Sequence, residues 1–398
     1  MNLTSRERVR RTFDRQAVDR CPIDLGAHFS TGISAFAYAR LREHLGLAEK
    51  PIRIIDPVQF LAQVDDDVLE RFSCDVRCLR APWPGTHTWT PRDGCTFHVP
   101  ASMQPQLQAD GSWTVARNGQ TMRMPAGGFF FDGAWPSFDD RPWPEQSTAL
   151  RAEAERLRAT GSAVFLMQSV WAFFSDNPDW LMRAAEDPEA MAAENAKRCD
   201  EAIAQVGRLI DLLGDRVDII DMNADLGAQK APMIGPKLYE QVTFPFVKRV
   251  IDFVHANSDW KVFMHSCGAI CPLLPYLADA GVDALNPVQI SASGMDPQVL
   301  KERFGKRLVF WGGGCNTQQV LGTGTPDEVR ANVRQLVGTL GAGGGMVFTA
   351  VHNIMGDVPP QNIVAMYDEA KLCGRSALAA AAQQLGCAPG DQRQPEQG

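Results

Sequence analysis

The chain has 398 residues, and its 39 Lys and Arg against 47 Asp and Glu leave a formal net charge of −8. Affinity for nucleic acid comes mainly from clustered basic side chains, so this acidic balance, with no basic stripe, excludes a nucleic-acid binder. A composition that is 45% hydrophobic and 22% charged is typical of a globular protein and excludes disorder as the main state.

The first residues carry charges but no apolar run of the kind found in signal peptides, and no later apolar run approaches the ~18 residues that a membrane helix needs. The ten cysteines are irregularly spaced, which indicates reduced thiols rather than a disulfide framework. We therefore expect a cytoplasmic protein without membrane contact, in which a functional cysteine is a metal ligand or a nucleophile.

Short β-branched and apolar runs alternate with helical patterns along the chain. The predicted strands are 21–26, 74–79, 163–168, 217–222, 261–265, 282–286, 307–312 and 346–351. The predicted helices include 187–213, 235–257, 270–280 and 325–340. Eight strands alternating with helices predict an α/β fold of the TIM (β/α)8 barrel type, whose catalytic groups lie at the C-terminal strand ends.

Residues 82–144 fall outside this repeat and are rich in Trp, Gly, Pro and Thr. The dipeptides Asp110-Gly111 and Asn118-Gly119 are hairpin signals. They predict a small antiparallel β insertion after the second strand, at the barrel mouth, where it could cap the site or meet a partner. We expect residues 1–375 to form a single barrel catalytic domain that includes this insertion, and residues 376–398 to form a flexible tail.

The sharpest chemical signal is His265-Ser-Cys267, which closes the predicted strand 261–265. Side chains of an extended segment repeat every two residues, so His265 and Cys267 face the same way at the catalytic rim. Imidazole and thiolate suit zinc, and a catalytic zinc needs a third protein ligand. Cys315 and His352 also end predicted strands and are the candidates. A cysteine is often only a small buried apolar residue, but the shared strand-end placement favours a metal site.

Several segments resemble the uroporphyrinogen decarboxylase superfamily, and the resemblance extends over nearly the whole chain. They are residues 4–9, 19–24, 225–229, 265–268, 286–289, 311–314 and 357–363. Within that superfamily the chain resembles the branch of zinc-dependent methylcobamide:coenzyme M methyltransferases and O-demethylase methyltransferases. True uroporphyrinogen decarboxylases carry an Arg-containing segment after the first strand, which pairs with their substrate's carboxylates. Here residues 24–32 contain no arginine, so porphyrinogen decarboxylation is not expected.

The resemblance implies a Zn²⁺ site at His265 and Cys267. The methyltransferases have a further cysteine after the last strand, where this chain has His352, so we rank His352 above Cys315 as the third ligand. A second thiolate would better preserve the nucleophilicity of a bound thiol, whereas two histidines and one cysteine leave the metal more electrophilic.

Other polar residues follow the predicted strands and could orient the substrate or the metal ligands. The candidate catalytic residues are Asp225, Gln229, Asn286 and Gln289. Capping of a helix is an equally good interpretation of Asp225. His28 and Ser30 follow the first strand and either line the mouth or are structural.

The expected function is a zinc-dependent methyltransferase or demethylase component, which moves a methyl group between a small methylated donor and a corrinoid, folate or thiol acceptor. A corrinoid would come on a partner protein, because the chain has no Asp-x-His-x-x-Gly motif. A second copy of the chain, in a homodimer, is a further expected partner. The alternatives are a metal-free decarboxylase of a carboxylated small molecule and a non-catalytic barrel that binds a ligand or a corrinoid protein.

Overall fold

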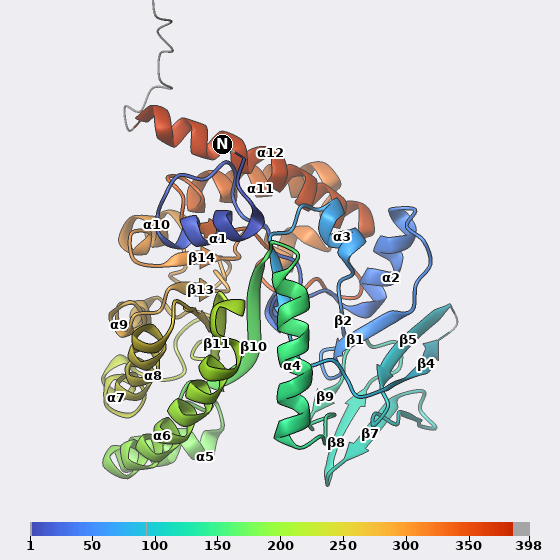
Figure 1. Cartoon of the computed structure of the whole chain (residues 1–398), viewed down its shortest axis with the longest axis horizontal. Coiled ribbons are helices and arrows are strands. Elements are labelled where there is room, and N and C mark those ends of the chain that lie inside the picture. Colours follow the sequence, from blue (N-terminus) through green and yellow to red (C-terminus); the bar gives the residue numbers. More distant parts are fainter. Residues whose placement is uncertain (1, 93, 385–398) are drawn as a thin grey trace, which may run out of the picture.

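The computed structural model describes residues 2–92 and 94–384, without the side chains of residues 169 and 374–384. At its centre is a curled sheet of seven parallel strands (Figure 1), in the order that the sequence predicts. The strands are β3 (Val76–Leu79), β10 (Ala163–Trp171), β11 (Ile219–Asn223), β12 (Lys261–His265), β13 (Ala284–Asn286), β14 (Val309–Trp311) and β15 (Met346–Val347). The fold is a TIM barrel, as expected.

The remaining barrel strand, which was predicted at 21–26 as the first in the chain, is reduced to a single β-bridge. This bridge joins Ile23 to Phe348, the residue that follows β15. On its other side the Ile23 carbonyl accepts a hydrogen bond from the Asp75 N–H, at 2.8 Å. Pro22 has no N–H to donate, and Gly26 turns the chain at φ +84°. The segment therefore closes the barrel between β15 and β3 but is too short for a regular strand.

Helices cover the outside of the sheet. They are α1 (Ser5–Phe13), α2 (Ala35–His44), α3 (Asp66–Arg71), α4 (Trp143–Arg158), α5 (Pro178–Glu186), α6 (Pro188–Leu213), α7 (Pro236–Val242), α8 (Phe244–Asn257), α9 (Leu274–Ala280), α10 (Pro297–Phe304), α11 (Pro326–Leu340) and α12 (Pro360–Gln384). The single helix predicted over 235–257 is two, because a helix continued through Thr243 would bring Pro245 against the carbonyl four residues earlier. The predicted capping box of Thr325 and Glu328 is present at α11.

The helix predicted over 270–280 begins with a 3₁₀ turn, Cys271–Leu273, before α9. At the other end of the chain, α12 continues to Gln384 and so enters the predicted tail. Residues 385–398 of that tail lie outside the described residues. In the part of the chain that is described, no helix is long and apolar enough to cross a membrane.

The insertion after β3 forms two small sheets beside α2 and α4 (Figure 1). One sheet has the order β6 (Gln106–Leu107), β7 (Trp113–Arg117), β8 (Gln120–Met124) and β9 (Asp132–Gly133). The other combines β4 (Thr86–Arg92) and β5 (Cys95–Pro100) with two strands that the sequence did not predict, β1 (Ile52–Asp56) and β2 (Leu61–Ala62). The predicted turn Asn118-Gly119 is a two-residue hairpin between β7 and β8, and both its residues have positive φ.

Candidate metal centre and cavity

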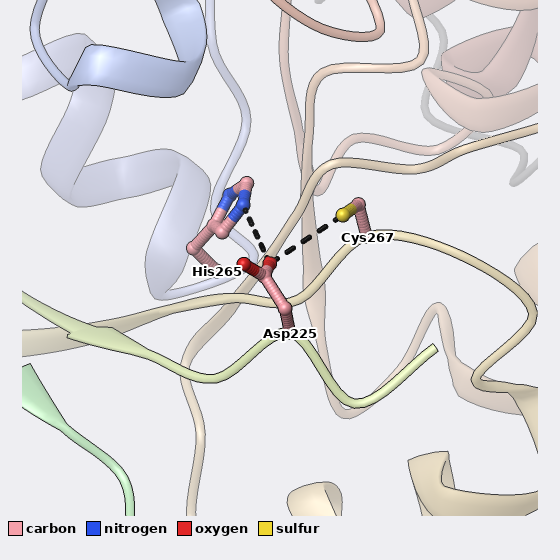
Figure 2. Close-up of side chains that lie close together, drawn as sticks. All are labelled: Asp225, His265 and Cys267. Carbon is pink, nitrogen blue, oxygen red and sulfur yellow. Dashed lines mark hydrogen bonds and ion pairs between the residues drawn. The ribbon is translucent and has the colours of Figure 1, made fainter. Parts of the chain in front are cut away.

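Three potential metal ligands converge at the C-terminal rim of neighbouring strands. Asp225 follows β11, while His265 ends β12 and Cys267 comes two residues later. The carboxylate Oδ1 of Asp225 lies 3.5 Å from His265 Nε2 and accepts a hydrogen bond from Cys267 Sγ at 3.4 Å. Figure 2 shows Asp225 between the other two side chains. The three ligand atoms all lie within 4.8 Å of one another, and their oxygen, nitrogen and sulfur chemistry suits a transition metal such as zinc.

Backbone packing between two loops holds this arrangement. A Cβ at Gly268 (φ +88°) would overlap the carbonyl group of Gly227, and a Cβ at Gly227 would lie 2.6 Å from the Cys267 carbonyl oxygen. The Ala269 N–H donates to the Ala228 carbonyl at 2.8 Å. Because glycine at both positions lets the two backbones touch, the Asp225 loop and the Cys267 loop bring their side chains together.

The orientation of the His265 ring is set from behind by Asn286, which is its partner in the register of β12 and β13. The Asn286 amide donates from Nδ2 to the Trp311 carbonyl at 2.9 Å, so its Oδ1 faces His265 Nδ1 at 2.8 Å. His265 Nδ1 therefore carries a proton, and Nε2 faces Asp225, to which it donates when the ring is charged and beside which it is free to bind a cation when the ring is neutral. Ser30 Oγ donates to the same Asn286 oxygen at 2.6 Å, and Ser30 is in turn bonded to His28 Nδ1 at 2.7 Å.

Asp225 and His265 shift each other's pKa in opposite directions. A hydrogen bond from His265 holds the pKa of Asp225 below its usual value. Burial lowers the pKa of His265, but Asp225 and Cys267 outweigh burial and raise that pKa to about 10. The protein alone therefore stabilises an imidazolium and carboxylate pair here, and a cation that binds in its place must displace the imidazolium proton.

The two residues predicted as alternative third ligands have different surroundings. His352 lines the same cavity as the three converging residues, and its ring centroid lies 5.8 Å from that of His265. Burial lowers the pKa of His352 to about 3, so its ring is neutral at neutral pH. Cys315 is fully buried in the apolar layer between strands and helices, and burial raises its pKa to about 12. Among the described residues, the convergent group consists of Asp225, His265 and Cys267.

Gln229 and Gln289, both predicted as catalytic, lie together behind the Cys267 loop. Gln289 Oε1 accepts a hydrogen bond from the Gly268 N–H at 2.7 Å, and its Nε2 donates to Gln229 at 3.0 Å. Gln229 also donates to the Ser291 carbonyl at 2.6 Å. These contacts, like those of the fully buried Asn286, join protein groups to one another and brace the loop that carries Cys267.

A cavity of about 970 Å³ opens above the three convergent side chains. Its walls come from the barrel rim and from the insertion, whose residues 129–139 contribute to the lining. Aromatic side chains form much of the apolar part of the walls, among them Phe29, Trp83, Phe129, Phe131, Trp135 and Trp171. Arg80 is the only Lys or Arg among the described residues of the lining, which also includes five aspartates. The cavity is thus suited to an apolar or aromatic compound rather than to a polyanion.

The sequence reasoning missed two parts of this site. It treated Asp225 as an orienting or capping residue, although β11 and β12 are consecutive and therefore adjacent in a barrel, which places Asp225 beside His265. It also predicted no aromatic wall, because the aromatic residues come from segments far apart in the sequence. The abundance of tryptophan in the insertion was the available signal.

Comparison with known proteins finds a matching family model and curated relatives of low identity. Residues 175–372 match the family model described as Uroporphyrinogen decarboxylase (URO-D). The uroporphyrinogen decarboxylases of Ralstonia pickettii and Psychromonas ingrahamii are 24% identical over 169 residues and 26% identical over 171 residues. These matches cover 38% and 39% of this chain but only 43% and 44% of the relatives, which is less than half of their length.

Among solved structures, a methyltransferase from Methanosarcina mazei is similar over 93% of this chain and 99% of its own, with a TM-score of 0.52. The sequence identity between the two is 13%, so the likeness concerns the fold.

Proposed function

We propose that the chain, whose residues 175–372 match the uroporphyrinogen decarboxylase family model, belongs to that superfamily and is a zinc-dependent methyltransferase or demethylase component. It moves a methyl group between a small methylated compound and a corrinoid, folate or thiol acceptor. The observation that carries this proposal is the convergence of Asp225, His265 and Cys267 at the floor of an aromatic cavity. Such a donor set is of no use to a reaction that needs only hydrogen bonds and cationic groups, whereas it suits catalysis at a bound metal.

The donor set fits zinc in the types of its ligand atoms and in the fixed orientation of the His265 ring. Carboxylate, imidazole and thiolate are all zinc ligands, and Asn286 fixes the His265 tautomer that leaves Nε2 free to bind. His352, on the same cavity wall, is the candidate for a further ligand. When bound, zinc supplies a Lewis acid that improves the leaving group of a methyl donor, or that holds a thiol acceptor as its thiolate.

The chain's own residues bind and shield the reactants. The aromatic walls offer flat apolar surfaces to a small methylated compound. Gln289 holds the Gly268 N–H, which fixes the loop that carries Cys267. A corrinoid acceptor would arrive on a partner protein at the cavity mouth.

The charge of the cavity argues against the decarboxylase alternative. A substrate with several carboxylates needs several cationic partners, but Arg80 stands against five aspartates in the described lining. Arg80 also donates to the Ile55 carbonyl at 2.6 Å. A polycarboxylate would therefore be repelled rather than held.

We expect the purified protein to hold about one zinc per chain, as measured by elemental analysis. Cys267→Ala should lose the metal, whereas Cys271→Ala, a half-buried cysteine outside the convergent group, should retain it. His352→Ala should weaken zinc binding about tenfold if His352 is a ligand, and Cys315→Ala should leave the metal content intact. Freshly isolated protein without any transition metal would contradict the site, and loss of metal in Cys315→Ala would reverse the ligand assignment.

The reaction is tested with labelled substrates. With a methylated corrinoid, or with a methylated donor and a corrinoid protein, we expect transfer of the methyl group and no release of carbon dioxide. The metal-depleted Cys267→Ala protein is the matched negative control. Release of carbon dioxide from carboxylated tetrapyrroles, with methyl donors left unchanged, would favour the decarboxylase instead.

A further inference from the structure

A second cavity, of about 760 Å³, lies beside the first. It is lined by Leu25 and Gly26 from the strand segment that closes the barrel, by residues 76–78 of β3, and by residues of β1 and α4. Arg80 and Trp83 line both cavities, so the two are separated by a shared wall. Among the described residues, the convergent group of Asp225, His265 and Cys267 does not line this second cavity.

The described lining of this cavity is rich in basic residues. It contains Lys50, Arg53, Arg77, Arg80 and Arg156 against Asp65, Asp66 and Glu153. Four of the five cations form ion pairs with carboxylates: Lys50 with Asp67, Arg53 with Asp65, Arg156 with Glu153, and Arg77 with Asp66. Arg77 differs from the other three because its side chain is buried and two of its nitrogen atoms lack a hydrogen-bond partner.

Arg77 is unusual because it is buried without full hydrogen bonding. Its side chain is 9% exposed, and its Nε and Nη1 atoms have no hydrogen-bond partner. The nearest carboxylate, Asp66 Oδ1, lies 3.4 Å from Nε as an ion pair, and the Asp66 side chain is 57% exposed to water. Burying charged donors without acceptors is costly, and an oxyanion in the cavity would supply the missing acceptors.

We propose that this second cavity binds a small molecule that carries a phosphate or carboxylate group, with Arg77 as the principal donor. Guanidinium groups are well matched to both oxyanions through planar, charge-assisted hydrogen bonds. The volume accommodates the rest of a drug-sized ligand. Arg80, which stacks over Trp83 at 5.2 Å, presents a second cation on the wall shared with the first cavity. This proposal does not depend on the reaction in the first cavity.

Binding is measured by titration calorimetry on the full chain with inorganic phosphate, pyrophosphate and succinate in separate experiments. We expect at least one of the three probes to bind. Arg77→Met should weaken that binding about tenfold by loss of the buried donor. Binding of the phosphates alone identifies a phosphate ligand, and binding of succinate alone identifies a carboxylate ligand.

A second variant keeps the test decisive if Arg77→Met fails to fold. Asp66→Asn removes the one carboxylate that competes for Arg77, and its exposed side chain makes the substitution safe for folding. It should strengthen anion binding about threefold. Asp252→Asn, an equally exposed carboxylate on α8 paired with Lys248, should change nothing. Absence of binding by all three probes, or weaker anion binding by Asp66→Asn, would overturn the proposal.

Discussion

The buried amide of Asn286 accepts hydrogen bonds from His265 and Ser30 and donates to the Trp311 carbonyl. Both polar atoms of this side chain therefore form hydrogen bonds to other protein groups. The sequence indicates a polar residue at a strand end, which predicts contact with substrate. Its burial behind His265 instead favours a positioning role, in which it holds one tautomer and one ring orientation.

Asn286→Ala should lower zinc affinity about 10- to 100-fold, because the His265 ring loses the acceptor that fixes its orientation. The measurement is competition with a chelator of known affinity. Asn362→Ala is the matched control, since Asn362 is also buried and donates to two backbone carbonyls, those of Leu321 and Gly324. Equal zinc affinities of the two variants would contradict the positioning role.

At the scale of elements, the strand ends explain what the sequence could predict of the site. His265 and Cys267 follow one strand, so the two-residue repeat of an extended chain predicts their common direction correctly. The same reasoning cannot place Cys315, because Gly312 and Gly313 have φ of +103° and +72° and break the alternation after β14. Cys315 therefore packs in the apolar layer under the helices.

The approach of Asp225 depends on contacts between loops rather than on either loop alone. The glycines at 227 and 268 lie 41 residues apart in the sequence, counting from one to the other, and only their backbone packing brings the carboxylate to the thiol. A local pattern predicts each strand and each loop but not this contact. That is why the barrel and two of the converging residues were predictable, while the third, Asp225, was not assigned to the group.

Gly268→Ala should separate the two loops, because its Cβ would overlap the Gly227 carbonyl group. We expect zinc affinity to fall at least about tenfold, on the same scale as the loss of a side chain that supports a ligand. Gly281→Ala is the control, since Gly281 has a similar φ of +92° and pays the same backbone strain of about 1–2 kcal/mol. Its Cβ would meet only side chains, at 3.3 Å or more. A normal zinc affinity in Gly268→Ala would show that the loop contact does not hold the site.

At the scale of the whole molecule, an aromatic cluster joins the insertion to the barrel. Phe97 of β5 lies with its ring centroid 5.0 Å from Phe36 of α2 and 5.1 Å from Phe60. Arg92 of β4 stacks over Phe36 at 4.2 Å. The Phe131 N–H, on the cavity wall, donates to the Val58 carbonyl at 2.8 Å. The insertion that walls the cavity thus shares its apolar core with the helical layer of the barrel.

This shared core predicts that the barrel and the insertion unfold together. Phe97→Ala deletes a fully buried ring and should cost about 3–5 kcal/mol, so both parts should lose stability in one transition at a lower temperature. Tryptophan fluorescence reports strongly on the insertion through Trp89 and Trp113, and far-ultraviolet circular dichroism reports on the helices. In the variant, as in the parent protein, the two signals should change together in a single transition, and in the variant that transition should lie at a lower temperature.

Leu107→Ala provides the control for this test, because Leu107 lies in the same insertion but its side chain is 62% exposed, so its loss should leave the transition unchanged. If the fluorescence of Phe97→Ala changed at a clearly lower temperature than its helical signal, the insertion would be a unit that folds separately from the barrel. The cavity wall would then be free to move without unfolding the strands that carry His265 and Cys267. A single transition means instead that one continuous core holds both the cavity wall and the candidate metal centre. Substitutions in the insertion then affect the site by lowering the stability of that core, as well as by changing contacts in the cavity.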